Sequence, residues 1–188
     1  MDQNVRLDGR QSNELRNTTI KKINEQVIFS QGLTSVRVFT EKSDKFEVKI
    51  LDCDDIDRKV FEMKLKLERL FTPLINQTEV AVNLYVIQDN GSLFSTLVNA
   101  ITICFCYSGI HLNDFVVGIT LNQNLDLCLI EEKKEDYLNL VYSVKNDKIL
   151  YLESVGKIYS EFLVERIETG IKATKVLHND LVNKILIN

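Results

Sequence analysis

The sequence has 188 residues, of which 45% are hydrophobic and 27% are charged, and its formal net charge is −4 at neutral pH. This balance excludes an intrinsically disordered chain, and the length suits one domain over residues 1–188 with a substantial core. The net acidity argues against an autonomous nucleic-acid-binding domain of the usual basic kind, although it is compatible with a local basic patch.

The most distinctive pattern lies at the beginning of the chain, where residues 6–16 read R-x-D-G-R-x-x-x-E-x-R. The Asp-Gly pair is a turn signal, because glycine adopts positive φ at low cost and aspartate bonds the nearby backbone. The arginines and acidic residues allow several ion pairs. Taken alone, the pattern fits a solvated charged arm as well as it fits a functional motif.

The next part of the chain predicts three β-strands, because runs rich in Val, Ile, Thr and Phe are separated by short polar breaks. In the middle strand, Val36 and Val38 alternate with Arg37 and Phe39, so one face should be polar. The expected strands cover residues 18–29, 34–40 and 46–51.

An amphipathic helix is expected next, because hydrophobic residues from Ile56 to Leu74 recur at spacings of three and four. Pro73 marks its expected end. Its other face carries the densest group of positive charges in the chain, which is either a solvated face or a surface that contacts RNA. These positive residues are Arg58, Lys59, Lys64, Lys66 and Arg69.

The alternating apolar residues 80–86 predict a further strand. Ser92 follows a polar turn and is placed to cap a helix. Residues 93–107 are apolar nearly all round, so this helix should be buried, and Gly109 should end it.

The last third of the chain predicts four strands and a long helix that begins at Ser160. Residues 131–136 carry mixed charges and are expected to form a solvated loop rather than a metal site. The order of elements predicts an α+β fold with right-handed crossovers. The four strands are expected at residues 115–121, 125–130, 137–144 and 149–153.

The four cysteines form no C-x-x-C pair, and two histidines are too few to complete an obvious metal site. We expect buried free thiols in a reducing compartment. No apolar run reaches the ~18 residues needed to span a bilayer, and we expect a soluble intracellular chain without a signal peptide. The cysteines are Cys53, Cys104, Cys106 and Cys128.

Seven segments of the chain, in the right order, resemble motifs of the RNase PH family, which includes the ring subunits of the RNA exosome. The resemblance implies mixed sheets with packed helices, as in the second domain of ribosomal protein S5. Among subtypes, the chain looks most like the eukaryotic exosome subunit related to the catalytic subunit of archaeal exosomes. The segments are residues 6–16, 30–36, 57–62, 86–92, 97–102, 108–110 and 125–132.

The resemblance also implies which chemistry to look for. Active relatives use inorganic phosphate to cleave the 3′ end of RNA, so positive groups must hold two anions together. Their phosphate site is a glycine-rich loop that ends in Thr-Arg at a helix N-terminus. The matching loop here is Asn90, Gly91 and Ser92, followed by Leu93 where the arginine is expected. Loss of that charge-assisted contact costs roughly several kcal/mol of transition-state binding.

Two other parts of the family's site have counterparts. Arg58 and Lys59 match the paired arginines that grip RNA, although lysine lacks the fork geometry. The general-acid aspartate should fall near Asp136, but matching Asn139 to the family's D-x-N spacing puts Tyr137 there instead. Both alignments remain open at this point.

These observations favour a ring subunit of the exosome core without catalytic activity, cofactor or metal, in the nucleus, nucleolus and cytoplasm. The resemblance implies other RNase PH-like ring subunits, S1/KH cap subunits, a separate 3′–5′ exoribonuclease and single-stranded RNA as partners, and no membrane. One alternative is an active phosphate-dependent 3′–5′ exoribonuclease whose missing arginine is replaced from elsewhere. Another is an unrelated S5-like binding module.

Overall fold

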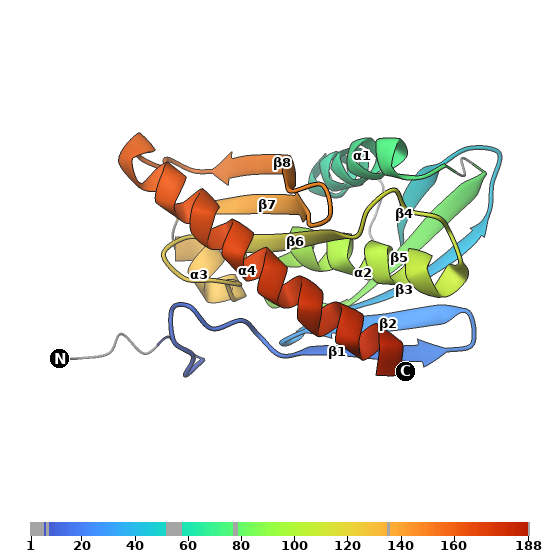
Figure 1. Cartoon of the computed structure of the whole chain (residues 1–188), viewed down its shortest axis with the longest axis horizontal. Helices are drawn as coiled ribbons and strands as arrows, with labels where there is room; N and C mark the ends of the chain where they lie inside the picture. The colour runs from blue at the N-terminus through green and yellow to red at the C-terminus, as the bar shows by residue number, and fades with distance from the viewer. Residues whose placement is uncertain (1–5, 7, 52–57, 77–78, 135, 188) are drawn as a thin grey trace.

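The computed structural model describes residues 6, 8–51, 58–76, 79–134 and 136–187. Two sheets and four α-helices make up these residues (Figure 1). The larger sheet has the order β1-β2-β3-β5-β4, and the smaller antiparallel sheet has the order β6-β7-β8. The strands are β1 (Thr18–Ile23), β2 (Gln26–Gln31), β3 (Thr34–Lys42), β4 (Glu47–Leu51), β5 (Val80–Gln88), β6 (Val116–Leu121), β7 (Tyr137–Ser143) and β8 (Lys148–Val155). The helices are α1 (Arg58–Phe71) with the 3₁₀ turn η1 (Thr72–Leu74), α2 (Leu93–Ser108), α3 (Leu129–Lys134) and α4 (Ser160–Ile187).

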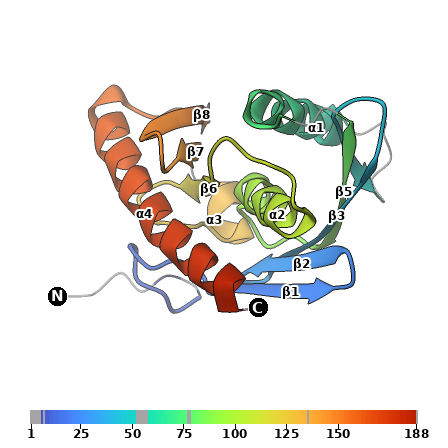
Figure 2. The same ribbon diagram turned by 45° about the vertical axis from the view of Figure 1, so that its right-hand side comes forward.

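Helix α2 lies at the centre of the molecule, between the two sheets (Figure 2). Every residue from Phe94 to Phe105 is buried, as expected for a helix that is apolar nearly all round. Gly109 ends α2 in the left-handed conformation at φ 69°, which confirms the expected stop. This helix therefore links the two sheets into one core and presents its N-terminus to the polar site described below.

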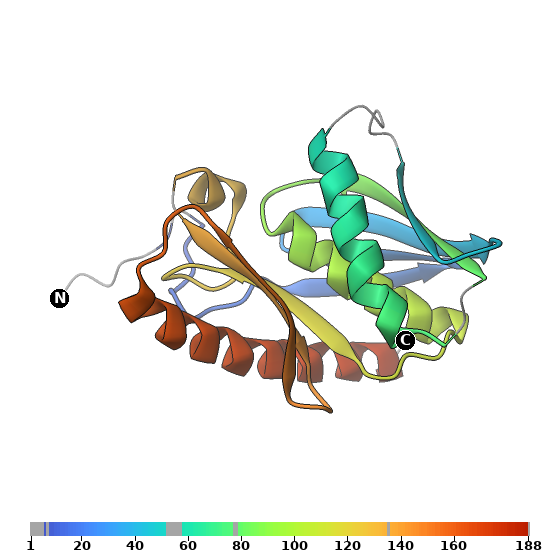
Figure 3. The same ribbon diagram turned by 90° about the horizontal axis from the view of Figure 1, so that it is seen from above.

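The other long helices cover the sheets from outside. Figure 3 shows α4 running along the length of the molecule, and it packs on β6, β7 and β1. Helix α1 packs on β4 and connects it to β5, and these two strands are parallel. The helix that was predicted to end near Pro73 is confirmed from Arg58 onward. It ends at Phe71, and Pro73 lies in the 3₁₀ turn η1 directly after it. Its expected beginning lies outside the described residues.

Two strand predictions are wrong. The single strand expected at 18–29 is a hairpin of β1 and β2, because Asn24 takes a left-handed φ of 55° and turns the chain without glycine. The strand expected at 125–130 is a turn, with Asp126 at φ 55°, followed by α3. The expected solvated loop after it is also wrong, because residues 129–134 are helical and Glu131 is buried.

The cysteine prediction is partly confirmed. Cys104 and Cys128 are buried free thiols, and burial raises the pKa of Cys104 to about 11. Cys106 is free but exposed, so its expected burial is wrong, and Cys53 lies outside the described residues. Among the described residues, no cluster of His, Cys, Asp and Glu is arranged to hold a metal, and no helix is long and apolar enough to cross a membrane.

Candidate functional site

The opening charged segment is anchored to the protein by its first and last arginines, Arg6 and Arg16, which are buried, whereas most of the described residues between them are exposed. Arg16 has only 8% of its surface exposed, and its partner Asp126 is fully buried. The Nε and Nη2 atoms of Arg16 donate to Oδ1 of Asp126 at 2.9 and 2.6 Å, and the backbone N–H of Arg16 donates to Oδ2 at 2.9 Å. The remaining Arg16 donors bond the carbonyl oxygens of Asn90 and Gly91 at 3.1 and 3.2 Å. Arg16 therefore holds the residues that match the phosphate loop.

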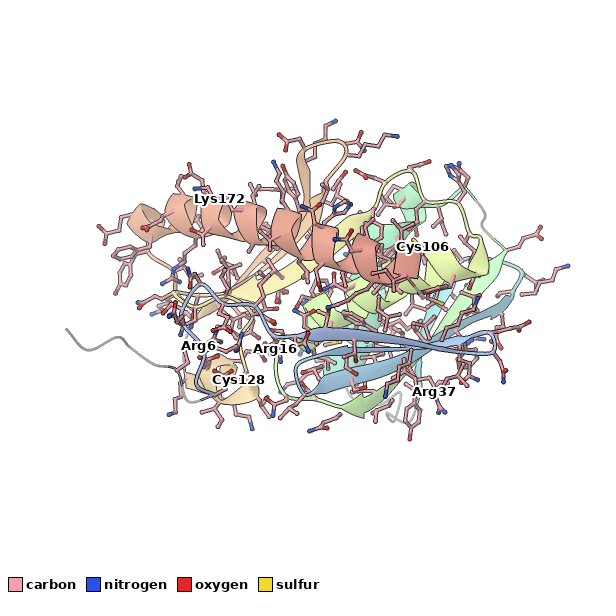
Figure 4. The ribbon with its side chains drawn as sticks, turned by 60° about the horizontal axis from the view of Figure 1, so that its bottom comes forward. Arg6, Arg16, Arg37, Cys106, Cys128 and Lys172 are labelled. Atoms are coloured by element: carbon pink, nitrogen blue, oxygen red, sulfur yellow. The ribbon has the colours of Figure 1, made fainter. Side chains whose placement is uncertain are left out.

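A second buried arginine fixes α3 in the same region (Figure 4). Arg6 donates from Nε and Nη2 to the two carboxylate oxygens of Glu131 at 2.7 and 2.6 Å. Burial alone would lower the pKa of Arg6 and raise the pKa of Glu131, but the hydrogen bonds and charges of the pair outweigh burial in both groups. The pKa of Arg6 is therefore raised and that of Glu131 is lowered. This fork-to-fork geometry makes a strong ion pair, so α3 is anchored to the beginning of the chain.

The loop that matches the phosphate site packs directly against the beginning of α3 at Gly91. Gly91 has a φ of 87°, and a Cβ at this position would meet the backbone C of Cys128 and N of Leu129 at 2.4 Å. The N–H of Leu129 donates to the carbonyl of Asn90 at 3.0 Å. Only glycine allows this approach, so the loop and the beginning of α3 form one unit.

Ser92 occupies the expected N-cap position of α2, but its side chain does not cap the helix. The residue is left-handed at φ 53°, and its Oγ donates to the carbonyl of Leu127 at 2.9 Å. Its backbone N–H donates to the Glu132 carboxylate at 2.5 Å. Burial, with smaller contributions from Asp89 and Asp126, raises the pKa of Glu132 to about 7. The carboxylate of Glu132 thus accepts the hydrogen bond that the backbone N–H of Ser92 offers at the N-terminus of α2.

A cleft of about 370 Å³ opens beside Leu93 and Phe94, between α1, the beginning of α2 and the strands β7 and β8. Acidic side chains outnumber basic ones in its lining. Lys66 is neutralised by Glu153, with 2.5 Å between Nζ and Oε1. The basic residues of the cleft are Lys59 and Lys66, and the acidic ones are Glu62, Asp89, Glu132 and Glu153. The lining therefore disfavours the binding of two anions.

The structure separates the two candidates for the general acid. Tyr137, the first residue of β7, lines the cleft together with Asn139. Burial, followed by the negative charges of Glu132 and Glu153, raises the pKa of Tyr137 above its ordinary value, so its phenol stays protonated at neutral pH. Asp136 instead lines a different cavity and lies against Gly156, where a Cβ would meet its Oδ1 at 1.8 Å.

The positive residues of α1 do not act as one group. Arg58 is exposed and pairs with Glu62 at 2.8 Å, whereas Lys66 points into the cleft toward Glu153. Lys59 also lines the cleft, and Arg69 is exposed near the end of the helix. Lys64 is half-buried on a different side, near Glu47, where the pKa of the carboxyl is lowered mainly by hydrogen bonds from Ser43 and Lys49 and least by the charge of Lys64. The structure brings Lys59 and Lys66 together and separates them from Lys64.

The same architecture occurs in solved structures and the same sequence pattern in curated proteins. The crystal structure of rice (Oryza sativa) Rrp46 superposes with a TM-score of 0.84 at 22% identity, over 96% of this chain and 100% of that chain. The exosome complex component SKI6 of Saccharomyces cerevisiae is 25% identical over 89% of this chain and 84% of its own length. The exosome complex component ski6 of Schizosaccharomyces pombe is 24% identical over 69% of this chain.

The chain is therefore similar to RNase PH-like exosome subunits in both fold and sequence. Its aligned part spans 57% of the fission-yeast relative, and no protein-family model matches it. The predicted α+β fold is confirmed by the likeness to RNase PH and exosome structures.

Sequence reasoning missed two residues of this RNase PH-like site, Glu131 and Glu132. Both glutamates lie in the segment 125–132 that resembles a family motif, but no local periodicity marks a helix of six residues. The partner of Glu131 is 125 positions away in sequence, at Arg6. The order of the charged motifs was the available signal, because the first and last of them bond each other in the fold.

Proposed function

We propose that this chain is a non-catalytic ring subunit of an exosome core, which supports assembly and passes single-stranded RNA to a separate 3′–5′ exoribonuclease. Its relatives in both yeasts are exosome complex components. The proposed partners are other RNase PH-like ring subunits and S1/KH cap subunits. The proposed locations are the nucleus, including the nucleolus, and the cytoplasm.

The main support for the proposed absence of catalysis is Leu93. This residue lines the cleft at the beginning of α2, where the resemblance leads us to expect a phosphate-binding arginine. An apolar side chain neither donates a hydrogen bond to phosphate nor balances its charge. The acidic excess of the cleft supports the same conclusion, because a phosphorolytic site must hold phosphate and the RNA backbone together.

The positions of the two candidate general acids, Tyr137 and Asp136, also support this proposal. Tyr137 lies in the cleft with a raised pKa, far from the operating pH at which proton transfer is efficient, and Asp136 lies outside the cleft. We propose that Arg58 and Lys59 contact the RNA backbone in the assembled ring, with weaker contributions from Lys64, Lys66 and Arg69. Such contacts track phosphates without reading sequence.

Assembly is tested by co-expressing the chain with the RNase PH-like ring subunits of a related exosome and measuring the native mass of the purified product. We expect a ring that contains one or more copies of this chain, because the chain shares its fold with exosome subunits over nearly its whole length. A chain that remains monomeric in the presence of each RNase PH-like partner would contradict the proposed role in a ring.

A further inference from the structure

A second cavity, of about 630 Å³, lies at the beginning of α4, away from the cleft. Its walls come from the turn after β6, the end of α3, the connection from β8 to α4 and the first turns of α4. Figure 2 shows strands of the smaller sheet between α4 and α1, so this cavity and the positive residues of α1 lie on different sides of the molecule. None of the residues that line this cavity also lines the cleft.

Two aromatic side chains stand exposed in this cavity. Tyr159 has 72% of its surface exposed, and Phe162 has 47%. Neither belongs to a hydrophobic core cluster of the described residues, and neither makes a ring-to-ring contact there. Large aromatic rings lose hydrophobic stabilisation when they face water, so two adjacent free rings are suited to receive planar, unstacked ligands such as nucleobases.

Three positive side chains accompany the rings: Lys134, Lys157 and Arg166. Within the described part of the chain none of them forms an ion pair, in contrast to Arg58 and Lys66 on α1. Their charges are therefore available to a negatively charged ligand.

The charge balance distinguishes this cavity from the cleft. Two carboxylates, Asp136 and Glu165, also line it, so three positive groups face two negative ones. In the cleft, two lysines face four carboxylates. A small positive excess around exposed aromatic rings matches a strand of alternating bases and phosphates, because rings stack on bases and cations contact the backbone.

We propose that the cavity at the beginning of α4 is a binding site for single-stranded RNA, in which bases stack on Tyr159 and Phe162 and Lys157 and Arg166 contact phosphates. Recognition of this kind is tolerant of sequence, because every base has a stacking face. The inference goes beyond the proposed function, since it requires only the folded chain and does not depend on ring assembly or on the residues of α1.

The test measures binding of a fluorescent oligouridylate of about ten nucleotides to the full chain by fluorescence anisotropy. We expect Tyr159→Ala combined with Phe162→Ala to weaken binding roughly tenfold or more, and Tyr159→Phe to preserve it, because phenylalanine keeps the stacking face. We expect Lys157→Ala with Arg166→Ala to weaken binding and to reduce its dependence on salt concentration. Lys172→Ala is the matched control, since this exposed lysine also lies on α4 but outside the cavity (Figure 4).

The location is tested independently by photocrosslinking the full chain, alone and in the assembled ring, with the same oligonucleotide carrying 4-thiouridine. Crosslinked peptides that contain Tyr159 or Phe162 would support the site. Crosslinks confined to α1 would overturn it while leaving the proposed ring function intact. An isolated chain without affinity for the RNA, or binding that is unchanged in the aromatic double variant, would also overturn it and leave a protein-docking surface as the explanation.

Discussion

Arg16→Ala is expected to lower the free energy of unfolding by about 3–5 kcal/mol, because it leaves a fully buried carboxylate without its partner. Asp126 receives three hydrogen bonds from Arg16, two of them from the guanidinium. The substitution also removes the donors that hold the carbonyl oxygens of Asn90 and Gly91. Chemical denaturation of the variant and of the original chain measures the difference.

A matched control separates this effect from the general cost of losing an arginine. Arg58→Ala removes the same side chain from an exposed position where, among the described residues, it pairs with Glu62 at i,i+4. We expect a change within about 0.5 kcal/mol there. Arg16→Lys should fall between the two, because lysine keeps the charge but cannot bond Asp126 and the loop carbonyls together. Equal losses for Arg16→Ala and Arg58→Ala would contradict the role given to the opening segment.

Gly91→Ala is expected to destabilise the protein by about 3 kcal/mol or more. The new methyl group would lie 2.4 Å from backbone atoms of Cys128 and Leu129, which cannot move aside as a flexible side chain could. The positive φ of 87° adds backbone strain. Separation of the loop from α3 should also raise the rate of hydrogen exchange at the N–H of Leu129, which bonds Asn90.

Gly109→Ala is the control for this substitution, since Gly109 has a similar φ of 69° but no heavy atom within 4 Å of the added Cβ. Gly109→Ala should lower the free energy of unfolding only by the cost of placing alanine at positive φ, about 1 kcal/mol. Thermal or chemical unfolding of the two variants compares them directly. If Gly91→Ala were as mild as Gly109→Ala, the contact between the loop and α3 would be looser than the structure describes.

The elements that could be predicted from the sequence are those with a clean local period. Hydrophobic residues recur at every second position of β5 and at every third or fourth position of α4, and α2 is apolar nearly all round. The errors arose where the backbone departs from the usual turn chemistry. Asn24 and Asp126 both adopt positive φ without glycine, which converts an expected strand into a hairpin in one case and into a turn in the other.

The candidate site could be predicted only where the signal is local. The place of Leu93 at the beginning of a helix could be predicted, because it follows a glycine loop, and in the structure Leu93 lines the cleft. The choice between Asp136 and Tyr137 depends on which residue begins β7, and a single sequence does not determine that register. The burial of Glu132 depends on the packing of α3 against the loop, so its raised pKa had no local signature.

The most direct test of the proposed function is the release of nucleoside diphosphates from single-stranded RNA in the presence of inorganic phosphate. It should be measured for the chain alone and for the assembled ring, with the separate exoribonuclease absent. We predict no phosphate-dependent release in either case, because Leu93 and the acidic cleft cannot hold phosphate beside the RNA backbone. Phosphate-dependent release that disappears in the Arg58→Ala variant would contradict the account and establish the chain as an active exoribonuclease.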